Sequence, residues 1–217
     1  MRLLLALAAA LLAAPAAAQG VPQPPGPYVL DLRIVTSGVP QAAAFLPPVA
    51  ADAPVPTRGT GFEAGAHVYA GRLGPARLGF GVSLMKVRAK AMPIVPETTA
   101  PPPPTTPPTP ATTGPPGIEI DLRSLTPQIS FNFGTREGWS YLSIGGGLSE
   151  VVGKTVNFID VRRESGRVTI LNAGGGARWF VTSHIAVGFD LRMHRLSQSA
   201  TLPRSTLFSA SGGISLR

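Results

Sequence analysis

The chain of 217 residues contains no cysteine, which excludes a disulfide scaffold, a Cys-ligated zinc site, an iron–sulfur cluster and a thiol nucleophile. Charged residues are sparse at 14% and aromatic residues at 6%, although 44% of residues are hydrophobic. Unfolded chains are rich in charge and poor in apolar residues, so this composition favours a folded protein of about one domain. The 24 prolines and 25 glycines disfavour a helical bundle, because both residues destabilise helix interiors.

The N-terminus has the layout of an export signal. Arg2 precedes an apolar run from Leu3 to Ala14, and Ala16 and Ala18 fit a small-x-small cleavage pattern. The sequence therefore predicts a signal peptide over residues 1–18, because the run is short for a retained membrane helix. Its removal leaves 18 basic against 11 acidic residues, so the net charge falls from +8 to +7. An exported chain rarely meets nucleic acid, and we expect no such partner.

Proline is concentrated outside the segments in which apolar and polar residues alternate. It enriches a lead at 19–26, and eleven prolines fall within residues 93–116. Proline lacks the N–H that a ladder or helix needs, so the sequence predicts a disordered Pro/Thr-rich loop at 91–117. Similar patterns flank this loop, and it is interpreted as an insertion in a single domain over 27–217.

Between these stretches, apolar and polar residues alternate with period two, which is typical of strands with two different faces. No later run reaches 18 apolar residues, so entry into a membrane would require a β-barrel. The apolar faces carry almost no charge over about 9–11 residues, the length of a tilted crossing. The expected strands are 28–37, 60–71, 77–89, 118–134, 139–149, 167–181, 185–196 and 206–216.

The connections between these strands alternate in length. The odd-numbered ones are long (38–59, 90–117, 150–166 and 197–205), and the even-numbered ones are short. Short turns at one end and long loops at the other are typical of transmembrane barrels. The sequence thus predicts an all-β fold, an eight-stranded antiparallel up-and-down transmembrane β-barrel.

Three segments carry a family resemblance: Thr126 to Gly134, Gly174 to Phe180 with the following turn and strand, and the C-terminal strand. In these the chain resembles the small eight-stranded outer-membrane barrels of the OmpA/OmpX type, over about residues 27–217. The resemblance implies outer-membrane lipid, lipopolysaccharide and the outer-membrane assembly machinery as partners, a monomeric state and no cofactor. Such barrels usually end in an aromatic residue, whereas the last apolar residue here is Leu216.

The polar faces of the strands carry acidic and basic residues together. Since an eight-stranded barrel is filled by its own side chains and buried charges need partners, we expect an ion-pair network that plugs the lumen. Glycines on the same faces would make room for these larger side chains. The predicted network consists of Asp31, Arg33, Glu63, His67, Arg178, Asp190 and Arg192.

Two further groups are predicted at the barrel ends. Aromatic residues cluster near the short turns and could form a girdle at the membrane interface: Tyr28, Tyr69, Phe131, Phe133, Trp139, Tyr141, Trp179 and Phe180. Basic residues recur near the long loops and could contact lipopolysaccharide phosphates, or form a solvated rim: Lys86, Arg88, Lys154, Arg162, Arg163 and Arg195.

Two motifs resemble catalytic signatures. Residues 147–155 miss the phosphate-cradling loop by one residue between the glycines, and no helix pattern follows. His194 and Ser197 are similar to the His-x-Ser pair of lipid A deacylase barrels, but their spacing of three places them on opposite faces. The histidines lack metal-ligand spacing, so no metal is expected.

The expected function is a structural or surface-interaction role without enzymatic activity. The main alternative is a soluble periplasmic barrel that binds an apolar ligand, since alternation does not say which face is inside. A small pore and a lipid A-modifying enzyme are the lesser alternatives.

Overall fold

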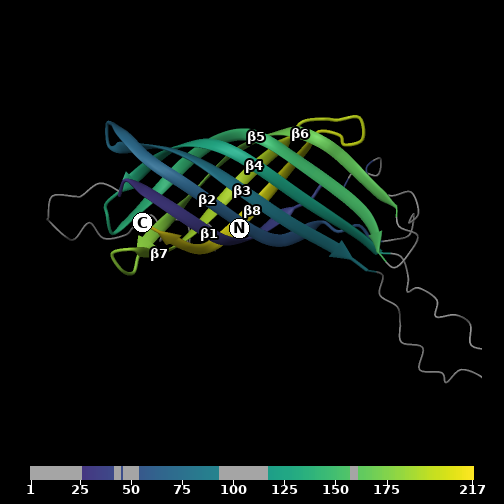
Figure 1. The fold of residues 1–217 in the computed structure, drawn as a ribbon, viewed down its shortest axis with the longest axis horizontal. Helices are drawn as coiled ribbons and strands as arrows, with labels where there is room; N and C mark the ends of the chain where they lie inside the picture. The colour runs from purple at the N-terminus through teal and green to yellow at the C-terminus, as the bar shows by residue number, and fades with distance from the viewer. Residues whose placement is uncertain (1–25, 42–44, 46–53, 93–116, 157–160) are drawn as a thin grey trace, which may run out of the picture.

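A computed structural model describes residues 26–41, 45, 54–92, 117–156 and 161–217. These residues form one closed barrel in which each strand pairs antiparallel with its sequence neighbour and β1 pairs with β8 (Figure 1). The predicted fold is confirmed. The strands are β1 (Tyr28–Gly38), β2 (Arg58–Leu73), β3 (Ala76–Ala91), β4 (Gly117–Gly134), β5 (Gly138–Val156), β6 (Arg162–Phe180), β7 (Ile185–Leu196) and β8 (Ser205–Leu216).

The β2–β3, β4–β5 and β6–β7 turns lie at one end of the barrel, here named the turn end, and the other connections leave from the loop end (Figure 1). Gly74 in the first of these turns has φ +60°, a backbone conformation that side chains with a Cβ rarely adopt. In the described part of the chain, no helix is long and apolar enough to cross a membrane. The predicted signal peptide at 1–18, most of the lead and loop residues 93–116 lie outside the described residues.

The expectation of a long connection at 150–166 is wrong. β5 continues to Val156 and β6 begins at Arg162, with Lys154 opposite Arg162 in the ladder. The physical reason is a change in which face carries the charge: beyond Leu148 the outer face carries Glu150 and Lys154, while Val151 is fully buried on the inner face. The inward and outward positions therefore continue to alternate while the polarity of each face reverses. A prediction that follows apolar residues on one face only ends the strand too early.

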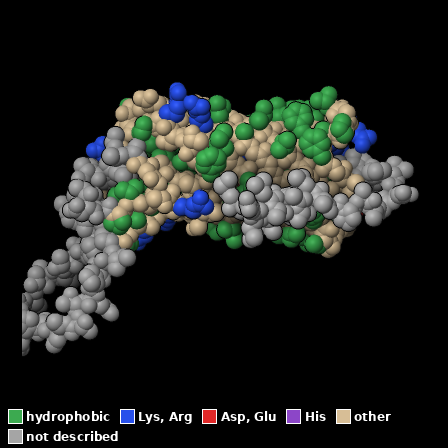
Figure 2. All heavy atoms as spheres, turned by 180° about the vertical axis from the view of Figure 1, so that it is seen from behind, with side chains coloured by type: hydrophobic (Ala, Val, Ile, Leu, Met, Phe, Trp, Pro, Cys, Tyr) green, Lys and Arg blue, Asp and Glu red, His purple; other side chains and the backbone are tan. Residues whose placement is uncertain are grey.

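The same reversal occurs on β3 and β4. Toward the turn end, the outer face carries large exposed hydrophobic side chains, and the inner face carries buried charge. Toward the loop end, the inner face is a cluster of aliphatic residues around Phe45, and the outer face of β3 and β4 is charged. On the face drawn in Figure 2, most Lys and Arg side chains lie in the half from which the long connections leave.

Candidate functional site

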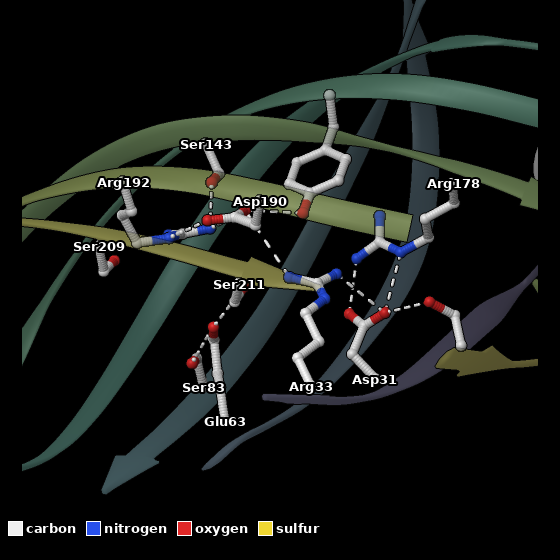
Figure 3. A network of polar contacts seen from close by, with 12 residues as sticks. Asp31, Arg33, Glu63, Ser83, Ser143, Arg178, Asp190, Arg192, Ser209 and Ser211 are labelled. Carbon is white, nitrogen blue, oxygen red and sulfur yellow. Dashed lines mark hydrogen bonds and ion pairs between the residues drawn. The ribbon is translucent and has the colours of Figure 1, made fainter. Parts of the chain in front are cut away.

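The carboxylate of Asp31, on β1, is the centre of a buried polar network (Figure 3). Arg178 from β6 donates to it from Nε at 2.9 Å and from Nη2 at 2.6 Å, and Ser215 from β8 donates at 2.6 Å. Arg33 adds an ion pair at 3.0 Å. Asp31 and Arg178 are 5% and 1% exposed, so both charges depend on these partners rather than on water.

Asp190, on β7, is the second centre of the network. It accepts from Arg192 Nε at 3.0 Å and Nη2 at 2.8 Å, and from the Tyr141 hydroxyl at 2.6 Å. Arg33 Nη1 lies 3.7 Å from its carboxylate, so this guanidinium connects the two centres (Figure 3). The Tyr141 ring lies 4.3 Å from the Arg178 guanidinium carbon, in cation–π geometry.

The donors of Arg192 reach four strands. Besides Asp190, its Nη1 donates to Gln128 at 2.7 Å and to Asn172 at 2.8 Å, and its Nη2 donates to Ser143 at 3.0 Å. Because the Gln128 oxygen accepts this bond, its amide nitrogen is the donor to His67 Nε2 at 2.9 Å. The His67 proton then resides on Nδ1, which faces the carboxylate of Asp31 at 3.5 Å.

Glu63 is the third carboxylate of the network, and it accepts hydrogen bonds from the hydroxyls of Ser83 at 2.8 Å and Ser211 at 3.2 Å. The structure places all seven predicted lumen residues on the inner face, each less than 8% exposed. Three guanidinium groups oppose three carboxylates, so the network carries no net charge when His67 is neutral. The neutral partners were not predicted as members of the network, although alternation placed them on the same faces: Ser83, Gln128, Tyr141, Ser143, Asn172, Ser211 and Ser215.

Buried apolar clusters lie on both sides of the network. Toward the turn end, Tyr69, Trp139 and Val29 form a buried cluster, with Phe180 stacked on Trp139 at a centroid distance of 5.1 Å. Toward the loop end lies the larger aliphatic cluster, which includes the fully buried Phe45. Buried side chains therefore occupy the inner face at three levels, and most of the network's polar donors bond within the protein.

Four members of the predicted aromatic girdle are misplaced. Tyr69, Trp139 and Tyr141 are 5%, 2% and 3% exposed and belong to the inner face, and Phe180 stacks on the inward Trp139. The prediction grouped aromatic residues by their closeness to a turn and disregarded strand parity, although Tyr141 shares parity with the inward Ser143. Tyr28 and Phe133 are exposed on the outer face, and Phe131 and Trp179 are half-buried there.

The predicted loop-end basic residues divide into three groups. On the outer wall, Arg88 pairs with Asp121 at 2.9 Å, and Lys154 pairs with Glu119 at 2.8 Å. Arg162 pairs with Glu164 at 2.7 Å. Lys86 and Arg195 have no carboxylate in ion-pairing distance among the described residues, and Arg163 lies opposite Gly153 on the inner face. Two further outward arginines, Arg123 and Arg167, were not predicted, although Arg123 shares parity with the outward Leu125.

Neither catalytic motif forms a site. Residues 147–155 are part of strand β5, with no helix to bind phosphate. His194 Nε2 meets Ser209 Oγ at 2.9 Å, whereas Ser197 Oγ accepts the backbone N–H of Thr169. His194 Nδ1 has no hydrogen-bond partner, so the pair lacks an acidic residue to orient it. Within the described ranges, no group of three or more His, Cys, Asp or Glu residues could hold a metal ion.

The geometry defines the architecture of a small outer-membrane barrel. No family model matches the chain, and no characterised protein matches its sequence. Neisserial surface protein A (NspA) is similar in structure, with a TM-score of 0.55 and 12% identity over 88% of this chain and 97% of that one. Ail of Yersinia pestis, in complex with the heparin analogue sucrose octasulfate, is also similar in structure. Its TM-score is 0.50 and its sequence identity 11%, over 87% of this chain and 97% of that one. These likenesses show the fold alone, which agrees with the predicted OmpA/OmpX-type architecture.

Proposed function

We propose that the protein is an integral outer-membrane β-barrel with a structural or surface-interaction role, exported through a cleaved signal peptide and without enzymatic activity. The supporting observation is the outer face of the barrel, which carries large exposed hydrophobic side chains. Among them, Ile34, Phe62, Leu142 and Phe208 are 67%, 66%, 62% and 62% exposed. A soluble monomer rarely exposes so large an apolar surface, whereas a lipid-facing barrel wall requires one.

The soluble alternative requires an apolar inner face along the membrane-length part of each strand. There the inner face instead carries Asp31, Arg178 and Asp190. Cell fractionation tests the proposal: we expect the full-length protein in the outer-membrane fraction, resistant to a urea wash. We also expect folded and boiled samples to migrate differently on a denaturing gel. Recovery in the soluble periplasm would overturn the proposal.

The second element of the proposal is a lumen closed by its own side chains. It is supported by the three filled levels: the turn-end aromatic cluster, the neutral charge network and the loop-end aliphatic cluster. Recording in planar lipid bilayers tests this element. Purified protein should give no large, stable conductance, and a steady open channel would favour the pore alternative instead.

The proposed partners are outer-membrane lipid, lipopolysaccharide and the assembly machinery, with a monomeric barrel. The enzymatic alternative lacks support because the His194–Ser209 pair has no orienting carboxylate and His194 is 4% exposed. A hydrolysis assay on purified lipid A tests it, and product formation that is lost in Ser209→Ala would establish the enzyme.

A further inference from the structure

The outer wall of β2 to β6 contains a sharp boundary between apolar and basic side chains. The strand register aligns one outward row of small and aliphatic residues, Ala64, Leu84, Leu125 and Leu148. Two residues farther toward the loop end, it aligns a second outward row, Phe62, Lys86, Arg123, Glu150 and Arg167. Neighbouring strands lie about 4.8 Å apart and alternate residues about 7 Å apart, so the rows are in contact range.

A bulge in β6 places Arg167 in this row. The β5–β6 register shifts between Glu150 and Val152, where Gly166 has φ +65° and Ser165 Oγ accepts the backbone N–H of Val151 at 2.9 Å. The extra residue returns Arg167 to the position opposite Glu150. Lys86, Arg123 and Arg167 thereby span three strand gaps, about 14 Å.

The cations of this row lack the ion pairs that several cations farther toward the loop end form. One step farther toward the loop end, Arg88 is paired with Asp121, and beyond that Lys154 is paired with Glu119. Within the described residues, Lys86, Arg123 and Arg167 have no carboxylate at ion-pairing distance. Three cations thus face a single acidic residue, Glu150, in the row nearest the lipid-facing surface.

A groove of about 460 Å³ runs across both rows. Its apolar part is lined by Phe62, Leu84, Leu125 and Leu148, of which the leucines are 55%, 45% and 49% exposed. Its basic part is lined by Lys86, Arg123 and Arg167. The apolar part is continuous with the exposed hydrophobic wall of the barrel. The groove therefore presents an acyl-binding surface and an anion-binding surface in one place.

We infer that this groove binds a phosphate-bearing lipid of the outer leaflet, with its acyl chains along Leu84, Leu125 and Leu148 and its phosphates against Lys86, Arg123 and Arg167. A soluble anion gains nothing from the leucines, and an uncharged apolar ligand gains nothing from the cations. Arginine and lysine form strong charge-assisted bonds to phosphate. The inference rests on the proposed outer-membrane location. It assigns a defined lipid site that includes Arg123 and Arg167, which were not among the predicted lipopolysaccharide contacts.

Native mass spectrometry of the full-length protein in detergent micelles tests the site. The probes are diphosphorylated lipid A, the same lipid without phosphates, and inorganic phosphate as a competitor. The variants are Lys86→Gln, Arg123→Gln and Arg167→Gln, alone and together. Arg58→Gln on β2 is the matched control, because Arg58 is another exposed cation near the loop end, without a carboxylate partner among the described residues and outside the predicted lipopolysaccharide contacts. Heat-modifiable migration confirms that each variant is folded.

We expect one bound lipid A per barrel, at least tenfold weaker binding in the triple variant, and unchanged binding in Arg58→Gln. Glu150→Gln should bind more tightly, because it removes the one carboxylate in the row. Equal binding of the dephosphorylated lipid, or undiminished binding by the folded triple variant, would overturn the inference. Full displacement by inorganic phosphate would indicate a free-anion site and would also overturn it. Failure of membrane fractionation, by contrast, would affect the proposed location and leave this micelle measurement intact.

Discussion

Arg178 and Asp31 are 147 residues apart in the sequence and joined by two hydrogen bonds in the lumen, at 2.9 and 2.6 Å. The pair connects β6 to β1, which are not neighbours in the barrel. It therefore holds the inner side chains of opposite walls together, and it does so with charges that are shielded from water.

Asp31→Asn should destabilise the barrel by about 3–5 kcal/mol, because it leaves the Arg178 guanidinium buried without its counter-charge. Chemical unfolding in lipid vesicles, followed by the loss of heat-modifiable migration, measures the change. The double variant Asp31→Asn/Arg178→Gln should recover part of this loss, since it also removes the buried cation. Equal or greater loss in the double variant would show that the pair is stabilising in its own right.

Gly81→Ala should destabilise the barrel by about 1–3 kcal/mol through overpacking. A Cβ at this inward position would collide with the His67 ring, and it would lie 2.6 Å from the carbonyl oxygen of Ala66. Gly212→Ala is the matched control, because a Cβ there meets only an ordinary contact at 3.7 Å. Unfolding midpoints of the two variants in the same detergent compare them, and equal midpoints would contradict the expectation.

Phe45→Ala should lower the free energy of unfolding by about 3 kcal/mol, because Phe45 is fully buried in the loop-end aliphatic cluster. Phe208→Ala is a suitable comparison, since Phe208 is 62% exposed on the outer wall and its removal leaves no cavity. Urea titration in lipid vesicles measures both variants. A small effect of Phe45→Ala would mean that the aliphatic cluster closes without this side chain.

Arg217→Ala should reduce stability by about 1–2 kcal/mol. The Arg217 side chain donates to the carbonyls of Ser183 at 2.7 Å and Arg136 at 2.6 Å, and it lies 3.8 Å from the Phe180 ring centroid. It thus joins two turn-end loops that are distant in sequence. Arg217→Lys should restore less than half of the loss, because lysine lacks the planar fork. Thermal shifts of the folded band measure both variants.

Alternation in the sequence was sufficient for the strand number, the antiparallel order and the residues that share a face. Asp31 and Arg33, for example, had to share one face of the strand and Leu32 had to lie on the other, because successive side chains of a strand point to opposite sides. The same rule places Tyr141 inward with Ser143, and the girdle prediction was wrong where it disregarded that rule.

Other features depended on closure of the barrel. Alternation separates two faces but does not show which of them is inside the barrel. It also could not predict that Arg33 would contact both Asp31 and Asp190. The extension of β5 past Ser149 was missed because the apolar residues change face at Val151.

The sequence by itself therefore determined the local period, the turns and the composition of each face, since these follow from the backbone geometry of single strands. The tertiary structure alone decided which distant charges neutralise one another and which basic residues stay unpaired. Those relationships arise from the register between strands and from the shared interior, and neither is encoded within one strand.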